Sequence, residues 1–174
     1  MTFAPRRRLW VFNLHAELEL ARDAAAPYEP PRRVQQALAP MLPHARSLMA
    51  PGDRDLDDPE RERCPDAHPS EPWLGVAWCP TPTALRRLLR AGAEPAPAPG
   101  FEVLRRVNHR RFYVQLGGGA PGARYVETEA ELATTLAEPH VAWLFKRPYG
   151  FAGRGQRRIA GTPSPDDRRW LTDS

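Results

Sequence analysis

A single lysine beside a glycine-rich segment is the feature of this sequence that points most directly to chemistry. Only one of the 25 Lys and Arg residues is lysine, and it is Lys146, at the end of the apolar run 141–145. Gly150, Gly153 and Gly155 follow shortly after it. Lysine carries a compact, mobile ammonium that can point between phosphate oxygens, whereas arginine is a wide planar fork. The pattern therefore predicts a nucleotide-phosphate site at this segment.

A simpler explanation of the same residues stays open. Codon usage that favours arginine would leave one lysine at a chance position, and hairpins with several glycines are common. The prediction of a phosphate site therefore needs further evidence from the elements expected around Lys146.

The second half of the chain reads as an antiparallel α+β unit built around that segment. Thr128 and Glu131 form a capping box, which predicts a helix through Ala137. We expect a strand at 141–145 and its hairpin partner at 156–160, joined by the glycine segment. Further expected elements are a helix at 101–107, an extended or helical run at 111–116 and a short helix that starts at Ser164-Pro165.

The first half reads as strands alternating with helices, which predicts a small parallel sheet with helices on its faces. The expected strands are 9–14, 45–50 and 74–79. One helix is expected from Pro30-Pro31 to Pro43. Another is expected to begin after Thr81 as N-cap, to bury Leu85, Leu88 and Leu89, and to stop at Gly92. Segment 51–72 has little apolar content and predicts an exposed loop, and 94–100 predicts a stiff, extended connector.

Composition bounds the class of protein. The chain has 174 residues, 41% of them hydrophobic, and a net charge of +4, so it can form a packed core and contact anions. Cys64 and Cys79 have no CxxC partner, which favours a reduced setting. No run approaches the ~20 apolar residues of a membrane span. We expect a soluble, cytoplasmic protein.

Four segments together resemble the ATP-grasp superfamily. These are the Asn-x-basic element Asn108-His109-Arg110, the strand-like 124–128 before the capped helix, Lys146-Arg147-Pro148 at a strand end, and the Gly-x-x-Gly-x-Gly run 150–155. Their order and spacing fit over 105–160, and 8–92 resembles the domain that precedes the grasp. The resemblance implies a Rossmann-like domain at 1–92, a connector at 93–107 and a partial ATP-grasp N-terminal lobe at 108–174. The expected fold class is α/β, a small parallel sheet followed by an α+β unit.

The resemblance also assigns roles. Lys146 would contact the α- and β-phosphates of ATP, while Arg110 would match a basic ATP contact that is usually lysine in the family. Arg154 would reach a γ-phosphate or an acyl-phosphate, or else be a solvated loop charge. The flap over the phosphates would use the backbone of Gly150, Gly153, Gly155 and Gln156.

The implied activity is a carboxylate–amine or carboxylate–thiol ligase that uses ATP and Mg²⁺ and acts through an acyl-phosphate. The superfamily's Mg²⁺ ligands lie beyond the flap, so they are expected outside this chain, which would be inactive alone. Candidate substrate contacts follow the first and third strands, where loop polarity is the alternative: Asn13, His15, Cys79 and Thr81.

The expected partners are ATP and a small carboxylate, and no contact with a membrane is expected. A non-catalytic nucleotide- or nucleic-acid-binding module is the alternative, although the arginine pairs fall on different expected elements. A homodimer stays open.

Overall fold

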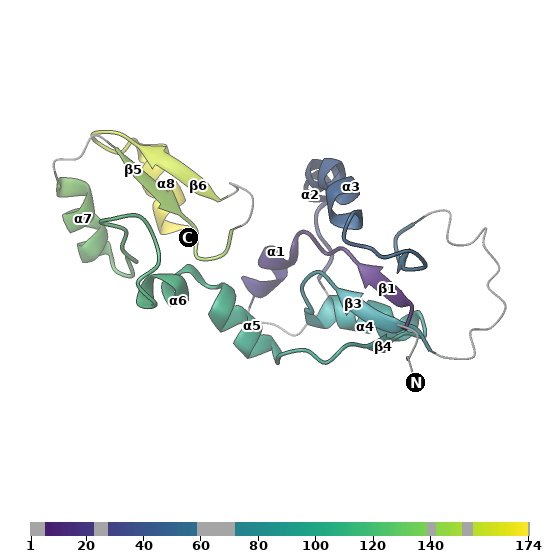
Figure 1. The fold of residues 1–174 in the computed structure, drawn as a ribbon. Coiled ribbons are helices and arrows are strands. Elements are labelled where there is room, and N and C mark those ends of the chain that lie inside the picture. Colours follow the sequence, from purple (N-terminus) through teal and green to yellow (C-terminus); the bar gives the residue numbers. More distant parts are fainter. Residues whose placement is uncertain (1–5, 23–27, 59–71, 139–141, 151–154, 174) are drawn as a thin grey trace. The chain divides into compact units, whose positions relative to one another are not determined.

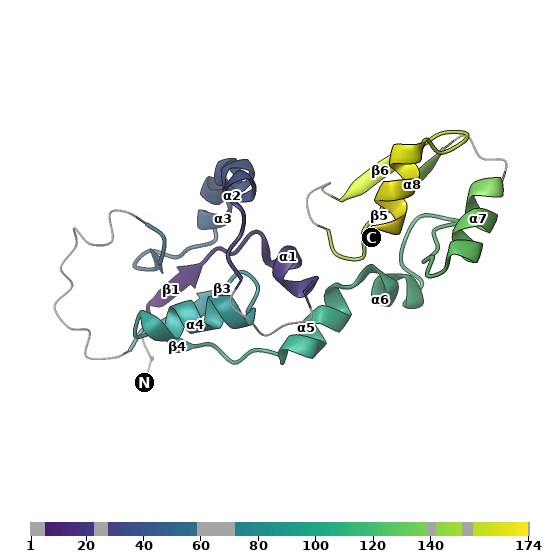
Figure 2. The same ribbon diagram turned by 180° about the vertical axis from the view of Figure 1, so that it is seen from behind.

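The computed structural model describes residues 6–22, 28–58, 72–138, 142–150 and 155–173. The chain divides into two compact units, 1–104 and 105–174. Figures 1 and 2 show the elements of each unit from two sides. No helix in the described part of the chain is long and apolar enough to cross a membrane.

A four-stranded, fully parallel sheet forms the centre of the first unit. Its strands are β1 (Arg8–Val11), β2 (Arg54–Asp55), β3 (Leu74–Ala77) and β4 (Glu94–Pro95), in the order β2-β1-β3-β4. The expectation of a parallel α/β sheet is confirmed. Because the chain crosses from one side of β1 to the other after β2, the carboxyl ends of β1 and β3 form a topological switch point.

Helices cover both faces of this sheet. Leu9 and Val11 pack with Leu88, on the face covered by α4. Phe12 packs with Leu38 on the other side, and the two sets form separate hydrophobic clusters. Burial on both faces explains why β1 reads as an unbroken apolar run. The helices of this unit are α1 (Ala16–Leu20), α2 (Arg32–Leu38), the 3₁₀ helix η1 (Ala39–Met41), α3 (Leu42–Arg46) and α4 (Pro82–Arg90).

The start and stop signals of α4 are confirmed, but its buried face differs from the prediction. Thr81 is the N-cap residue, Pro82 opens the helix, and Gly92 follows it with a φ of 76°. Leu89, expected in the core, is 59% exposed, and Ala84 is buried with Leu88 instead. Residues four apart share a helix face, so the Ala84–Leu88 pair sets the side that meets the sheet.

The second strand was predicted at the wrong place. Residues 45–50 are not a strand, because α3 runs to Arg46 and Pro43 helps to start that helix rather than ending the one before. The second strand is instead β2, within the segment expected to be an exposed loop. Asp55 is buried and accepts a hydrogen bond from Arg46 Nε at 2.8 Å.

Asp53 explains how so polar a segment joins the sheet. Burial alone would raise its pKa, but hydrogen bonds from Trp10 Nε1 and from the backbone amides of Ala50 and Arg8 hold the pKa below its ordinary value. These partners lie mostly far away in the sequence. The pattern of apolar residues in the sequence does not predict these hydrogen bonds.

The expected connector 94–100 begins as a strand. Glu94 and Pro95 pair with β3 as β4, at the edge of the sheet, where a proline is tolerated because its missing N–H faces away from the ladder. The helix expected at 101–107 is confirmed as α5 (Phe101–Asn108).

The second unit contains a two-stranded hairpin and short helices, as expected. Strand β5 (Trp143–Lys146) pairs antiparallel with β6 (Gln156–Ile159). The helices are α6 (Arg110–Gln115), α7 (Glu129–Ala137) and α8 (Pro165–Thr172). The capping box of α7 is confirmed, and α8 begins with a second one, formed by Ser164 and Asp167.

Candidate functional site

One face of the β5–β6 hairpin is exposed and carries Lys146. The register pairs Lys146 with Gln156 and Leu144 with Arg158. Directly paired residues in an antiparallel ladder lie on the same side, and so do residues two apart along a strand. These four side chains therefore share one surface, which we call the open face, and all four are exposed.

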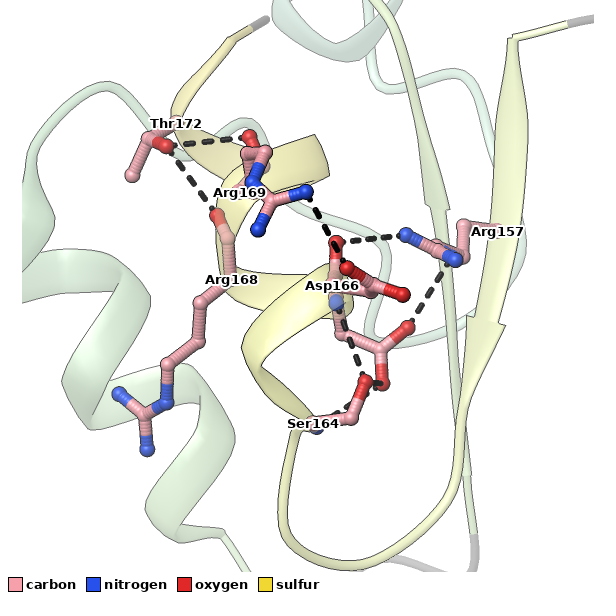
Figure 3. A network of polar contacts seen from close by, with 7 residues as sticks. Arg157, Ser164, Asp166, Arg168, Arg169 and Thr172 are labelled. Carbon is pink, nitrogen blue, oxygen red and sulfur yellow. Dashed lines mark hydrogen bonds and ion pairs between the residues drawn. The ribbon is translucent and has the colours of Figure 1, made fainter.

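The opposite face of the hairpin is covered by α8. Arg157 donates from Nη1 to the Asp166 carbonyl at 2.8 Å and forms an ion pair with Asp167 at 3.0 Å, at the first turn of the helix (Figure 3). Ile159, on the same side as Arg157, is buried. Since side chains alternate along a strand, this packing directs Lys146 away from α8.

The cations of the open face differ from most others in this unit. Among the described residues, neither Lys146 nor Arg158 has a hydrogen-bond or ion-pair partner. Within the described part of the second unit, the side chain of Arg168, on α8, is the other exposed cation of this kind. Carboxylates, backbone carbonyls or aromatic rings engage Arg106, Arg110, Arg111, Arg124, Arg147, Arg157 and Arg169. As far as the described residues go, the open face thus presents two positive charges without an anionic partner on one β-ladder.

The ends of the glycine segment are fixed by the backbone. The amide of Arg147 donates to the carbonyl of Gly155 at 2.7 Å, directly beyond the Lys146–Gln156 pair. Gly155 has a φ of 63°, in the left-handed region that favours glycine. Gly150 lies at the other end of this segment, whereas Gly153 and Arg154 fall outside the described residues.

Arg110 holds the chain that follows β5. Its Nε donates to the Arg147 carbonyl at 2.9 Å and one Nη donates to the Gly150 carbonyl at 3.0 Å. Its backbone amide also donates to the Pro148 carbonyl at 3.0 Å. We call Arg147–Gly150 the 147–150 loop. Any contact of Arg110 with ATP would have to use its remaining N–H groups, so that role stays a prediction.

His109 is a residue of this site that the sequence did not single out. It is the N-cap of α6, and its Nδ1 accepts a hydrogen bond from the Arg111 amide at 3.2 Å. Its ring meets the Tyr149 ring edge-on, with the centroids 5.0 Å apart. A histidine directly before a helix start was the only available signal, and histidine is not among the preferred N-caps.

Three of the four candidate substrate residues meet at the carboxyl ends of β1 and β3. Asn13 donates from Nδ2 to the Cys79 carbonyl at 2.7 Å and to Thr81 Oγ1 at 3.2 Å, and its Oδ1 accepts from the Cys79 amide at 3.0 Å. The fourth, His15, lies at the start of α1, where the centroid of its ring is 5.7 Å from that of Tyr28. Asn13 thus links the two strand ends.

A buried glutamate, also missed from the sequence, completes this cluster. Glu19 is only 2% exposed and accepts hydrogen bonds from Thr81 Oγ1 at 2.7 Å and from the Thr83 amide at 3.0 Å. Its carboxylate occupies the N-terminus of α4, where negative charge is favoured by the helix dipole. The hydrogen bonds of Asn13 and Thr81 to protein groups leave substrate contact by these side chains a prediction.

The surroundings of Cys79 disfavour its thiolate. Burial raises the pKa of its thiol to about 11, and the carboxylates of Glu19 and Glu17 add to the shift. Because the thiolate is the nucleophile, such a thiol is a poor attacking group.

No group of three or more His, Cys, Asp or Glu side chains suited to a metal ion occurs within the described ranges. Comparison of the chain with protein families, with curated proteins and with solved structures finds no match.

Proposed function

We propose that the open face binds the phosphates of ATP, with Lys146 as the principal contact, and that the chain is the ATP-binding part of an ATP-grasp ligase. The observation that carries the proposal is the pair of exposed cations, Lys146 and Arg158, which share a face with no anionic partner among the described residues. We take the missing anion to be the phosphates of ATP because residues 105–160 resemble ATP-grasp proteins.

Three properties of the face suit a nucleotide. A charge-assisted hydrogen bond from Lys146 contributes about 1.5–3 kcal/mol to phosphate binding. Arg158 adds a planar fork that can bind two oxygens at once. Leu144, which is 52% exposed beside them, offers apolar surface for the flat base or the sugar. A ligand with an anionic end and an apolar end matches this combination.

The proposed reaction joins a carboxylate to an amine or a thiol. The carboxylate oxygen attacks the γ-phosphorus of ATP and ADP leaves. The amine or thiol then attacks the carbonyl carbon of the acyl-phosphate, and inorganic phosphate leaves as the amide or thioester forms. When bound, Mg²⁺ would supply positive charge that offsets the negative charge of the phosphates. Among the described residues there is no cluster of three or more His, Cys, Asp or Glu suited to a metal ion, so the contacts proposed above concern phosphate binding only. Contact of the carboxylate with Asn13, His15, Cys79 or Thr81, which all belong to the first unit, stays a separate prediction.

The alternative, a nucleic-acid-binding module, has less support. Guanidinium groups of Arg7 and Arg54 lie 4.8 and 5.5 Å from the centroid of the Trp73 ring. These arginines cover part of the Trp73 ring, which makes this one ring a poorer platform for stacked bases. Binding to a nucleic acid would weaken steeply with salt, whereas a nucleotide site should respond to Mg²⁺.

Calorimetric titration with ATP·Mg²⁺ tests the proposal. Lys146→Ala should weaken binding about tenfold or more, Lys146→Arg should restore it only partly, and Arg158→Ala should weaken it by a smaller factor. Arg168→Ala is the matched control, because it removes an exposed, unpartnered cation from α8 and should leave affinity unchanged. Equal affinity in all variants would refute the open face as the site.

A further inference from the structure

His109 and its neighbour Arg110 contact the 147–150 loop, which directly follows Lys146. As N-cap of α6 it is adjacent to Arg110, whose backbone and side chain make three hydrogen bonds to the 147–150 loop. The His109 ring also packs edge-on against Tyr149 within that loop. The start of α6 and the loop after β5 are therefore one connected structure.

The cap works only when His109 is neutral. Its Nδ1 accepts from the Arg111 amide, so the neutral ring carries its proton on Nε2, which lies 3.4 Å from the hydroxyl of Tyr125. Protonation would place an N–H at Nδ1 opposite the N–H of Arg111. Two donors cannot form a hydrogen bond, and the new positive charge would lie at the positive end of the helix.

We propose that protonation of His109 releases the start of α6 and the 147–150 loop, which makes nucleotide binding at the open face sensitive to mild acid. The effect on nucleotide binding rests on the proposed function, whereas the release of the loop does not. The switch needs a single change: protonation turns the Nδ1 acceptor of His109 into a donor, and the cap is lost.

The surroundings of His109 set the pH range. Burial lowers its pKa, the charges of Arg111 and Arg105 lower it further, and Glu127 opposes them. The ordinary histidine pKa is about 6.5, so the folded state favours the neutral ring and the cap is intact above that value. As the pH falls below about 6.5, the unfolded chain takes up the proton first and stability decreases toward the lower, folded-state pKa. The titratable or charged groups that face the ring are Arg105, Arg111, Tyr125, Glu127 and Tyr149.

The test compares the whole chain with its His109→Asn and His109→Ala variants by NMR. Asparagine is a good N-cap that does not titrate, and alanine cannot cap. Between about pH 7.5 and 5, the amide signals of Arg111 and the 147–150 loop should titrate together in the wild type, with one apparent pKa below about 6.5. They should stay constant in His109→Asn. His109→Ala should show the acid-like signals at every pH.

Binding of ATP·Mg²⁺ over the same range measures the consequence. Wild-type affinity should fall about fivefold more than that of His109→Asn, which corrects for the titration of ATP itself. Loop signals that do not titrate, or that titrate equally in His109→Asn, would overturn the inference. Loop signals that titrate as expected in a chain that binds no ATP at any pH would support the release of the loop and refute the proposed function.

Discussion

Replacing Arg110 with alanine separates two roles that this arginine can have. If it holds the 147–150 loop, the variant loses two hydrogen bonds from a charged group, at 2.9 and 3.0 Å. Such bonds contribute about 1.5–3 kcal/mol each when well buried, and the half-buried position of Arg110 reduces the total to about 2–3 kcal/mol. If Arg110 is mainly a phosphate contact, the loop should not change.

Amide hydrogen exchange of Arg147 measures this cost directly. Its N–H donates to the Gly155 carbonyl and is protected as long as the loop is closed. A loss of about 2–3 kcal/mol corresponds to exchange that is roughly 30- to 150-fold faster. Arg110→Lys should fall between, because one ammonium cannot serve both carbonyls in the fork geometry.

Arg168→Ala is the control and should leave the exchange of Arg147 unchanged. Unchanged exchange in Arg110→Ala together with weaker ATP binding would refute the structural role of Arg110 and favour direct contact with the nucleotide.

Three further predictions concern the first unit. Glu19→Ala should lower the free energy of unfolding by about 2–4 kcal/mol in urea denaturation, because a buried hydroxyl and a helix amide lose their acceptor, and a change below the error of the measurement would contradict this. Cys79 should react slowly with a thiol reagent near neutral pH and faster as the pH approaches its pKa of about 11, measured in a Cys64→Ser background; rapid reaction near pH 7 would show that the thiol is activated. Gly75→Ala should destabilise the sheet by about 1–3 kcal/mol in the same denaturation assay, since its Cβ would lie 3.2 Å from Leu88, and unchanged stability would mean that Leu88 can move aside.

Local signals in the sequence predicted several elements correctly. The capping box of Thr128 and Glu131 and the start of α8 at Ser164 depend on side chains within one helical turn, so the sequence contains the whole interaction. The β5–β6 hairpin is also local, because its strands are joined by one glycine segment. Elements stabilised within a few residues are the ones that a single sequence can predict.

Elements stabilised by distant partners were missed. Strand β2 has only two residues, Arg54 and Asp55, and no apolar pattern. It is held by pairing with β1 and by Asp53, whose carboxylate accepts from Trp10 Nε1 at 3.0 Å. These contacts form only after the chain has folded.

The same limit applies to the candidate site. Lys146 stood out because its residue type is unique in the chain, but the loop contacts of Arg110 connect positions about 40 residues apart. The hydrogen bond from Thr81 to the buried carboxylate of Glu19 likewise depends on the sheet, which brings β1 next to β3. A glutamate in a short helix gives no sign in the sequence that it caps a distant helix.

The unique lysine allows a direct test of the central claim that the open face binds nucleotide phosphates. Reductive methylation with ¹³C-formaldehyde would label Lys146 and the terminal amino group, and methylation keeps the positive charge of lysine. If the open face binds the phosphates, the ¹³C signal of Lys146 should shift saturably with ATP·Mg²⁺ and shift little with adenosine, while the terminal signal stays constant. A Lys146 signal that does not move with ATP·Mg²⁺, or that moves equally with adenosine, would show that the open face is not the phosphate site.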